Sequence, residues 1–339
     1  MVHTLELSQR LNYSDERRLD KKLAAFFNGD VIFNSKEKMF IYGNHSNCPF
    51  KIGIERFFME NKGAFNRLSI IMNPAKVFYG NQVNVSDMNT AHMALCDLES
   101  LFAQIGISEY YPYLKLSRID YAIDIFLETQ EMVETYVALL QRGDIPHNFT
   151  PRMEYNTTSH RFDTYKDSLY YENKYVTINF YNKYEQLKEK AAEFIDPELA
   201  RGILRLEVQW KRPRIHYIVK HYGLQDLPHE FLNEQLAVTT VQDYLSKIAM
   251  LGDYYSLSKA KTLVLNSAFR DRHKDEMISF LTDVNNKRSL SEVKEKGMYP
   301  PNIYERIIKQ LNQLNINPVT IPGRWGYDYL PNLMNLIHQ

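Results

Sequence analysis

The sequence predicts an α+β fold, with a central, mostly antiparallel sheet and flanking helices, followed by a mainly helical C-terminal region. Short apolar or alternating runs separated by Asn, Gly and Pro recur between residues 31 and 210, which is typical of strands. Helical spacing dominates after about residue 223. The 339 residues, 44% hydrophobic and 24% charged, suit a globular chain of about two domains. We expect an α+β domain over 1–225 and a helical domain over 226–339.

The first part of the chain changes character near residue 30. Residues 1–30 look helical, because charged side chains surround the widely spaced Leu5, Leu11 and Leu19. Strand and helix patterns then alternate. In chain order, the predicted elements are strands at 40–42, 50–54 and 68–72, a helix at 89–106, a strand at 114–127 and a helix at 129–141.

The second part follows a polar, loop-like stretch at 142–168. Ser289 and Glu292 form a capping box, which marks the start of one helix. Proline-rich residues 317–322 are typical of a short edge strand. The remaining predicted elements are strands at 168–171, 175–181 and 203–210, a charged helix at 184–194, a basic helical stretch after 210, and helices at 243–251, 258–270, 275–283 and 302–314.

Composition excludes several classes of protein. The 41 basic residues balance the 41 acidic ones, so the chain cannot bind nucleic acid by bulk charge and would need local patches. Cys48 and Cys96 are the only cysteines, and with no secretory signal and no apolar run near 20 residues we expect reduced thiols, a cytoplasmic protein and no membrane partner. Phosphate-binding and dinucleotide glycine motifs, zinc spacings and a His-x-His pair are missing.

One strand carries acids in an unusual alternation. Asp120 and Asp124 share a face but lie roughly 13 Å apart along an extended strand, too far to hold one ion together. Glu207 lies in another alternating run, and if the two strands are neighbours Asp120 and Glu207 converge. Oxygen ligands of this kind suit Mg²⁺ or Mn²⁺. The alternative is that each acid pairs with an arginine on its own face, Arg118 or Arg205.

Tyr181 lies where a predicted strand runs into a helix, two residues before Lys183. A phenol with a pKa near 10 is a poor nucleophile at neutral pH. A nearby ammonium group or a metal-bound phosphate lowers that barrier. The alternative is a sheet tyrosine followed by a solvated lysine.

Basic and aromatic residues are interleaved after residue 200. Such a patch can hold phosphates and stack bases, and the alternative is a solvated helix face. The predicted C-terminal helix pair also carries cations in positions that suit contact with DNA, and the alternative, which the sequence favours, is a packing hairpin. The patch consists of Arg201, Arg205, Lys211, Arg212, Arg214 and Lys220 with Trp210, Tyr217 and Tyr222, and the helix pair carries Lys294, Lys296, Arg306 and Lys309.

Several short segments, taken together and in order, resemble the gene II replication endonuclease family of filamentous phages and its plasmid and prophage relatives. The resemblance covers roughly residues 67–224 and implies rolling-circle initiation: a tyrosine nicks one strand at the origin, stays on the 5′ phosphate and leaves a 3′ hydroxyl that primes synthesis. The segments are NPAKVFYGN (73–81), SRID (117–120), FYNK (180–183), GILRLEV (202–208) and YGL (222–224), with INPVTIP (316–322) near the end.

The resemblance implies roles for particular residues. Tyr181 matches the nucleophile and Lys183 its lysine, in a nicking domain over 1–225. Asp120 and Glu207 match acidic positions and are expected to bind Mg²⁺ or Mn²⁺, with Asp124 as a third candidate ligand. Gly80 is followed by Asn81 where relatives commonly have histidine, which puts that histidine's role in doubt here. The candidate DNA contacts are Lys76, Arg118, Arg205, Lys211, Arg212 and Arg214.

The implied partner is origin DNA, first double-stranded or as a hairpin and then single-stranded. A host helicase and a second copy of the chain are further candidate partners. Three other functions stay open at this point. They are a relaxase for conjugative transfer, a DNA-binding regulator without catalysis, and a metal nuclease that activates water and for which Tyr181 is only structural.

Overall fold

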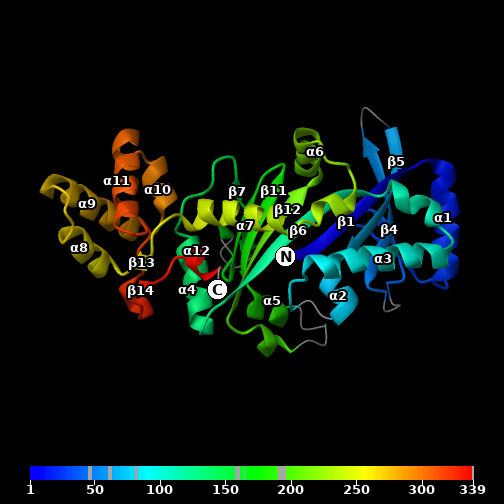
Figure 1. Ribbon diagram of the computed structural model, residues 1–339, viewed down its shortest axis with the longest axis horizontal. Helices are drawn as coiled ribbons and strands as arrows, with labels where there is room; N and C mark the ends of the chain where they lie inside the picture. The colour runs from blue at the N-terminus through cyan, green and yellow to red at the C-terminus, as the bar shows by residue number, and fades with distance from the viewer. Residues whose placement is uncertain are drawn as a thin grey trace. The chain divides into compact units, whose positions relative to one another are not determined.

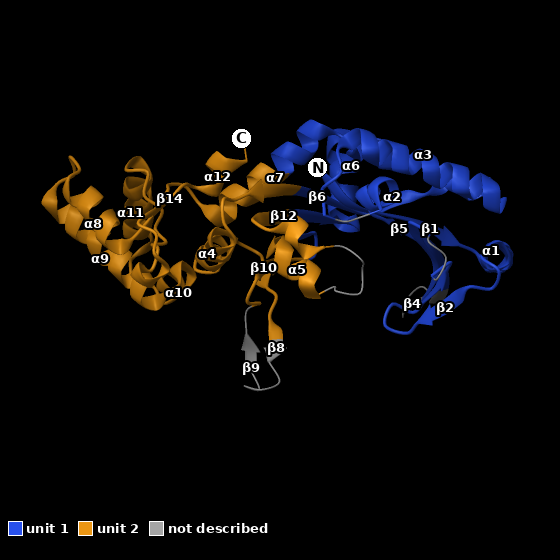
Figure 2. Cartoon of the chain, turned by 90° about the horizontal axis from the view of Figure 1, so that it is seen from below, with its two compact units in different colours: residues 1–122, 174–177, 207–240 blue, residues 123–173, 178–206, 241–339 orange. Residues whose placement is uncertain are grey.

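The structure is a computed structural model that describes residues 1–44, 48–59, 63–80, 83–156, 161–163, 165–189 and 196–337. It confirms the predicted α+β class: a ten-stranded sheet in the order β2-β3-β4-β5-β1-β6-β12-β11-β10-β7, helices, and a helical C-terminal region (Figure 1). Backbone contacts divide the chain into two compact units (Figure 2). Unit 1 is residues 1–122, 174–177 and 207–240, and unit 2 is residues 123–173, 178–206 and 241–339.

The strands of unit 1 form antiparallel pairs with one apolar face. Leu5 lies opposite Met72 and Ile119, and all three side chains are buried. Polar residues alternate with them, as the two-residue period of a strand requires. The strands are β1 (Val2–Leu11), β2 (Val31–Asn34), β3 (Met39–Tyr42), β4 (Phe50–Met59), β5 (Gly63–Met72) and the first part of β6 (Lys115–Phe126).

Helices complete unit 1, and Figure 2 shows α3 running along one side of β1 and β5. The Asp87 carboxylate caps α3 by accepting a 2.7 Å hydrogen bond from the Thr90 backbone N–H. Gly106 ends the helix in the left-handed conformation, with φ 75°. The helices are α1 (Tyr13–Phe26), α2 (Pro74–Tyr79), α3 (Met88–Ile105), η1 (Ser108–Tyr113), α6 (Arg212–Tyr222), η3 (Pro228–Phe231) and the first part of α7 (Glu234–Ala249).

The prediction of a helical N-terminus is wrong for the first residues. Residues 2–11 form β1, and the helix begins only at Tyr13. Leu5, Leu7 and Leu11 alternate with polar residues, and pairing with β5 and β6 on both sides buries all three leucines. The tertiary pairing therefore decides the conformation of a segment whose charge density looks helical.

Unit 2 holds the other strands and the helical C-terminal part. Residues 317–322 do not form the predicted edge strand. This segment has one isolated bridge, between Ile321 and Ser256. The further strands are β7 (Thr150–Pro151), β8 (Glu154–Asn156), β9 (Arg161–Asp163), β10 (Ser168–Glu172), β11 (Val176–Asn182), β12 (Ile203–Lys211), β13 (Tyr254–Tyr255) and β14 (Tyr329–Leu330), with β11 and β12 shared between the units.

The predicted C-terminal helices are present, with different limits. Ser289 caps α10 by accepting from the Glu292 backbone N–H at 3.1 Å, as the capping box predicts. In the described parts of the chain, no helix is long and apolar enough to cross a membrane. The helices of unit 2 are α4 (Gln130–Leu140), α5 (Lys183–Glu189), η2 (Pro197–Ala200), the rest of α7, α8 (Leu257–Leu265), α9 (Asp271–Lys287), α10 (Leu290–Glu295), α11 (Pro301–Gln313), η4 (Gly323–Trp325) and α12 (Leu333–Leu336).

Both units are discontinuous in sequence, so their limits differ from a single division between residues 225 and 226. That division stays a prediction about functional regions. Asn81, where the family pattern departs, lies outside the described residues.

Candidate metal centre and nucleophile

Three side chains from neighbouring strands of unit 1 converge on one point. His3 of β1, Asp120 of β6 and Glu207 of β12 each offer one ligand atom, and these atoms all lie within 4.8 Å of one another. The three strands are adjacent in the order β1-β6-β12. The structure thus brings Asp120 and Glu207 together, which is the arrangement that neighbouring strands were expected to produce. Their role as metal ligands stays a prediction.

A register shift places His3 in this group. Val2 lies opposite Tyr121 and Thr4 opposite Asp120, so β1 has one residue more than β6 at this point, and that residue is His3. Such a β-bulge re-aims a side chain and is frequent beside functional sites. The His3 Nδ1 atom lies 3.3 Å from Glu207 Oε1 and 3.0 Å from the Thr4 hydroxyl.

Arg118 holds the central carboxylate. Its Nε and Nη2 atoms donate to the two oxygens of Asp120 at 2.8 and 2.5 Å. Asp120 is only 1% exposed, and burial raises the pKa of its carboxyl, while the Arg118 charge and hydrogen bonds act in the opposite direction. Arg118 therefore neutralises one of the two carboxylates and orients it, a role different from the predicted DNA contact.

The donor set fits a divalent cation. Ligand atoms at about 2.1 Å from an octahedral ion are at most about 4.2 Å apart, so small side-chain movements would close the observed group around one ion. Two carboxylates suit Mg²⁺ and Mn²⁺, and the imidazole shifts the preference toward Mn²⁺. Residues His3, Asp120 and Glu207 would hold the ion.

His3 was not among the residues that the sequence pointed to. The sequence does contain a pattern that indicates its position. Leu5, Leu7 and Leu11 have the two-residue period of a strand, and a strand at the N-terminus places His3 in a sheet. The bulge that aims His3 at Asp120 has no such signal, because a register shift depends on the partner strand.

Asp124 lies outside the convergent group. It receives bonds of 2.5 and 2.8 Å from the Nε and Nη2 atoms of Arg205, whose side chain is 0% exposed. The alternating pattern left open that each acid pairs with an arginine on its own face, and for Asp120 that partner is Arg118. Arg205 pairs with Asp124. The geometry gives no support to Asp124 as a metal ligand or to Arg205 as a surface contact for DNA.

Tyr181 and Lys183 lie in unit 2, at the end of β11 and the start of α5. Tyr181 is 2% exposed, and the Lys183 ammonium lies 5.8 Å from the centre of its ring. Lys183 is itself buried and donates to Gln186 Oε1 at 2.8 Å, so it is not the solvated lysine of the alternative interpretation. The half-buried Tyr184 donates its hydroxyl to Glu198 Oε1 at 2.9 Å.

The predicted DNA-binding cations differ in their exposure and in their ion pairs with acidic residues of the protein. Arg212 donates to both oxygens of Asp226 at 2.7 and 2.5 Å, and Lys115 lies 3.3 Å from the same carboxylate. Lys76 is exposed on α2, and Lys211 is half-buried at the end of β12. Of these residues, Lys76 is the one whose position is most suited to a solvent-borne phosphate.

Aromatic groups accompany the basic patch on α6. The Arg214 guanidinium lies 5.2 Å from the Trp210 ring and 5.4 Å from the Tyr217 ring. Tyr217 and Tyr222 are both at least half exposed. The predicted aromatic rings are therefore at the surface for Tyr217 and Tyr222, whereas Trp210 is buried. Stacking on bases stays a prediction.

Most of the cations predicted on the C-terminal helix pair form ion pairs with acidic residues of unit 2. Lys294 pairs with Asp144, Lys296 with Glu292 and Arg306 with Glu276. A packing role explains these pairs without any nucleic acid.

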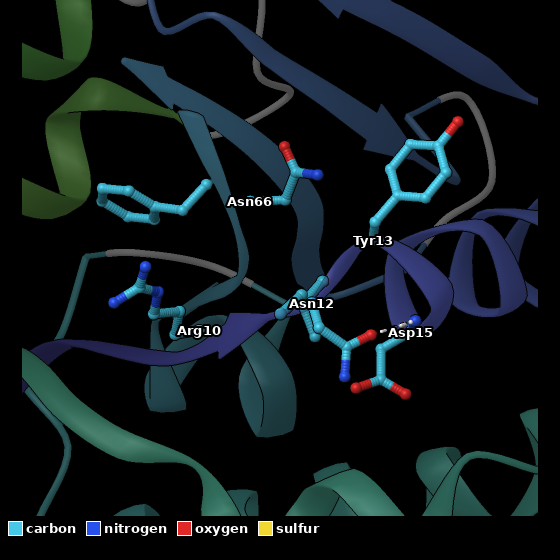
Figure 3. Close-up of a pocket in the computed structure, with 7 residues that line it drawn as sticks. Arg10, Asn12, Tyr13, Asp15 and Asn66 are labelled. Atoms are coloured by element: carbon cyan, nitrogen blue, oxygen red, sulfur yellow. Dashed lines mark hydrogen bonds between the residues drawn. The ribbon is translucent and has the colours of Figure 1, made fainter. Parts of the chain in front are cut away.

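An open cavity of about 530 Å³ lies where β1 meets α1 (Figure 3). Figure 3 shows Asn66 between Arg10 and Tyr13. The Arg10 guanidinium lies 4.9 Å from the Phe65 ring, and Asn12 accepts a bond from the Asp15 backbone N–H at 2.8 Å. Amide, guanidinium and aromatic groups of this kind recognise the edges and faces of nucleobases.

No family model and no curated protein matches the chain. Among solved structures, a rolling circle replication initiator protein from Geobacillus stearothermophilus is similar to this chain, with 13% identity and a TM-score of 0.33 over 73% of this chain and 84% of that one. A likeness of this degree assigns a role to no residue of this chain.

Proposed function

We propose that this protein is a rolling-circle replication initiator that nicks one strand of origin DNA. In this reaction Tyr181 forms a 5′-phosphotyrosine bond and leaves a 3′ hydroxyl primer, with Mn²⁺ or Mg²⁺ as cofactor. The observation that carries the proposal is the convergence of His3, Asp120 and Glu207 from three adjacent strands. The ordered segments that resemble the gene II family supply the tyrosine and the type of substrate. A host helicase and a second copy of the chain stay predicted partners.

Phosphodiester cleavage requires charge neutralisation at the phosphoryl oxygens, and a divalent cation bound at His3, Asp120 and Glu207 would supply it. Arg118 contributes by fixing the orientation of the Asp120 carboxylate through two hydrogen bonds. His3 is oriented in turn by its contacts with Thr4 and Glu207. A site pre-organised in this way needs little rearrangement when substrate binds.

Tyr181 has the chemistry that the covalent step requires. Its phenol oxygen loses a proton and forms a bond to phosphorus. The bond between phosphorus and the 3′ oxygen breaks, and the departing 3′ oxygen takes up a proton, so protons balance. The Lys183 ammonium, 5.8 Å from the ring, favours the negative charge that develops on the phenol. Because Tyr181 is buried, this role requires DNA binding to uncover its hydroxyl.

The same burial favours a second candidate, a metal-dependent nuclease that uses water. Such an enzyme needs His3, Asp120 and Glu207 but no accessible tyrosine, and Tyr181 would then be a core residue of β11. The products differ, because water leaves a free 5′ phosphate whereas tyrosine leaves a protein adduct.

The two candidates are separated by incubating the protein with supercoiled plasmid that carries its origin, in Mn²⁺ or Mg²⁺. We expect open circles with protein covalently bound to the 5′ end. Tyr181→Phe should abolish the adduct, and Tyr184→Phe, which removes a hydroxyl three residues away, should retain it. Nicking that survives Tyr181→Phe with a free 5′ phosphate would establish the water-using nuclease, and DNA binding without nicking in either metal would leave only the regulator.

A further inference from the structure

Three arginines surround a polar cavity of about 380 Å³ within unit 2. Arg142 follows the end of α4, Arg288 follows the end of α9, and Arg324 lies in η4. Segments far apart in the sequence thus bring three guanidinium groups to one place. Asn285, Asn286, Pro322 and Gly323 complete the lining.

These arginines have no acidic partners in the parts of the chain that the structure describes. Neither Arg142, Arg288 nor Arg324 forms an ion pair there, whereas Lys294 and Arg306 of the same unit each pair with an acid. Burial lowers the pKa of Arg142, and the positive charges of Arg288 and Arg324 lower it further. The fold therefore holds like charges together, at an energetic cost that a bound anion would remove.

Helix ends account for only part of this arrangement. Arg142 and Arg288 follow helix C-termini, where the macrodipole presents roughly half a negative charge. Two such ends amount to about one negative charge, against three full positive charges. The Arg142 guanidinium also lies 4.8 Å from the Trp325 ring, which positions it without neutralising it. A net positive cavity remains.

We propose that this Arg142–Arg288–Arg324 cavity binds a phosphate group, supplied by the backbone of DNA. Guanidinium forks match the oxygens of a phosphodiester, and two asparagine side chains add amide donors. Thr320 donates its hydroxyl to Asn285 Oδ1 at 3.3 Å, which orients that amide beside the cavity. The choice of DNA as the source rests on the proposed function, but the phosphate chemistry does not.

The test measures binding of a fluorescent origin duplex by anisotropy at several salt concentrations, in EDTA so that neither metal nor cleavage contributes. The variant is Arg288→Gln with Arg324→Gln, which keeps the side-chain stems, and the control is Arg272→Gln, an exposed arginine on α9. We expect the double variant to bind at least about tenfold more weakly. Its log–log salt slope should fall by about one to two, and the control should behave as the wild type. Removing like charges should not lower the melting temperature.

A second arm adds inorganic phosphate to wild type and double variant at constant ionic strength and follows the melting temperature. Phosphate should stabilise the wild type and not the variant. If phosphate stabilises the wild type alone while DNA affinity is unchanged, the phosphate site stands and DNA is overturned as its source. If the double variant binds DNA as tightly as the control and phosphate stabilises it as much as the wild type, the proposal is wrong. Nicking is scored separately, so loss of the Tyr181 mechanism would leave this result unaffected.

Discussion

Asp120 and Asp124 lie four residues apart on β6, and each accepts two hydrogen bonds from an arginine, yet their surroundings differ. Asp120, which pairs with Arg118, also has His3 and Glu207 close by: one ligand atom from each of the three residues lies within 4.8 Å of the others. Asp124 with Arg205 lies outside that group, and its arginine is fully buried. A carboxylate–arginine pair is therefore compatible with either a structural or a catalytic role. The additional ligands from neighbouring strands distinguish them.

The charges support this distinction. Arg205 binds both oxygens of Asp124 through two hydrogen bonds, so a positive charge already faces that carboxylate. Around Asp120, the Arg118 guanidinium interacts with two carboxylates, those of Asp120 and Glu207, beside the His3 imidazole. A buried carboxylate–arginine pair is typical of a structural contact, whereas two carboxylates beside an imidazole are a donor set of the kind that divalent ions use.

The largest effect is expected from breaking the Asp124–Arg205 pair. Asp124→Asn removes the carboxylate charge that the fully buried Arg205 contacts through two hydrogen bonds, and should lower the free energy of unfolding by about 3–5 kcal/mol. Urea denaturation measures this loss. Replacing both partners, Asp124→Leu with Arg205→Met, should recover most of it. Asp120→Asn, at the same position of the other pair, should instead abolish Mn²⁺-dependent nicking. If Asp124→Asn loses metal binding as much as Asp120→Asn does, the proposed difference between the two pairs is wrong.

The next effect concerns metal choice. His3→Ala removes the nitrogen donor and should weaken Mn²⁺ binding by about tenfold, with a smaller change for Mg²⁺, because imidazole suits Mn²⁺ better. Isothermal titration with each metal measures the two affinities. His92→Ala, on α3 outside the group, is the matched control. Unchanged Mn²⁺ affinity in His3→Ala would show that the imidazole is not a ligand.

The smallest effect is expected from the partly exposed pair of Arg212 and Asp226. Hydrogen bonds from Arg212 lower the pKa of the Asp226 carboxyl. A lowered folded-state pKa stabilises the fold above the unfolded value of about 3.9, and this contribution disappears as pH falls through the folded pKa. Asp226→Asn should therefore cost at most about 1 kcal/mol at pH 7 and progressively less below about pH 4. Melting curves between pH 3 and 7 test this dependence; a constant difference would contradict it.

Much of the fold follows from local pattern. The strands β4, β5, β6, β11 and β12 and the helix α3 appear close to where the spacing of apolar residues predicts them, although Asp87 caps α3 in place of the expected Asn89. The first eleven residues were misassigned, because their strand conformation depends on pairing with β5 and β6. The convergence of Asp120 and Glu207 was predicted only on the condition that their strands are neighbours, because alternation places both acids on strand faces but does not determine strand order.

The sequence by itself determined the α+β class, the acidic residues within strands of alternating polarity, and the segment that carries Tyr181 and Lys183. Periodicity and residue chemistry are local properties. Only the tertiary structure decided that a β-bulge places His3 beside Asp120, that Asp124 forms an ion pair with Arg205, and that three arginines line one cavity. Each of these depends on residues far apart in the chain. Their proximity is set by strand order and register, which the packing of the whole sheet determines.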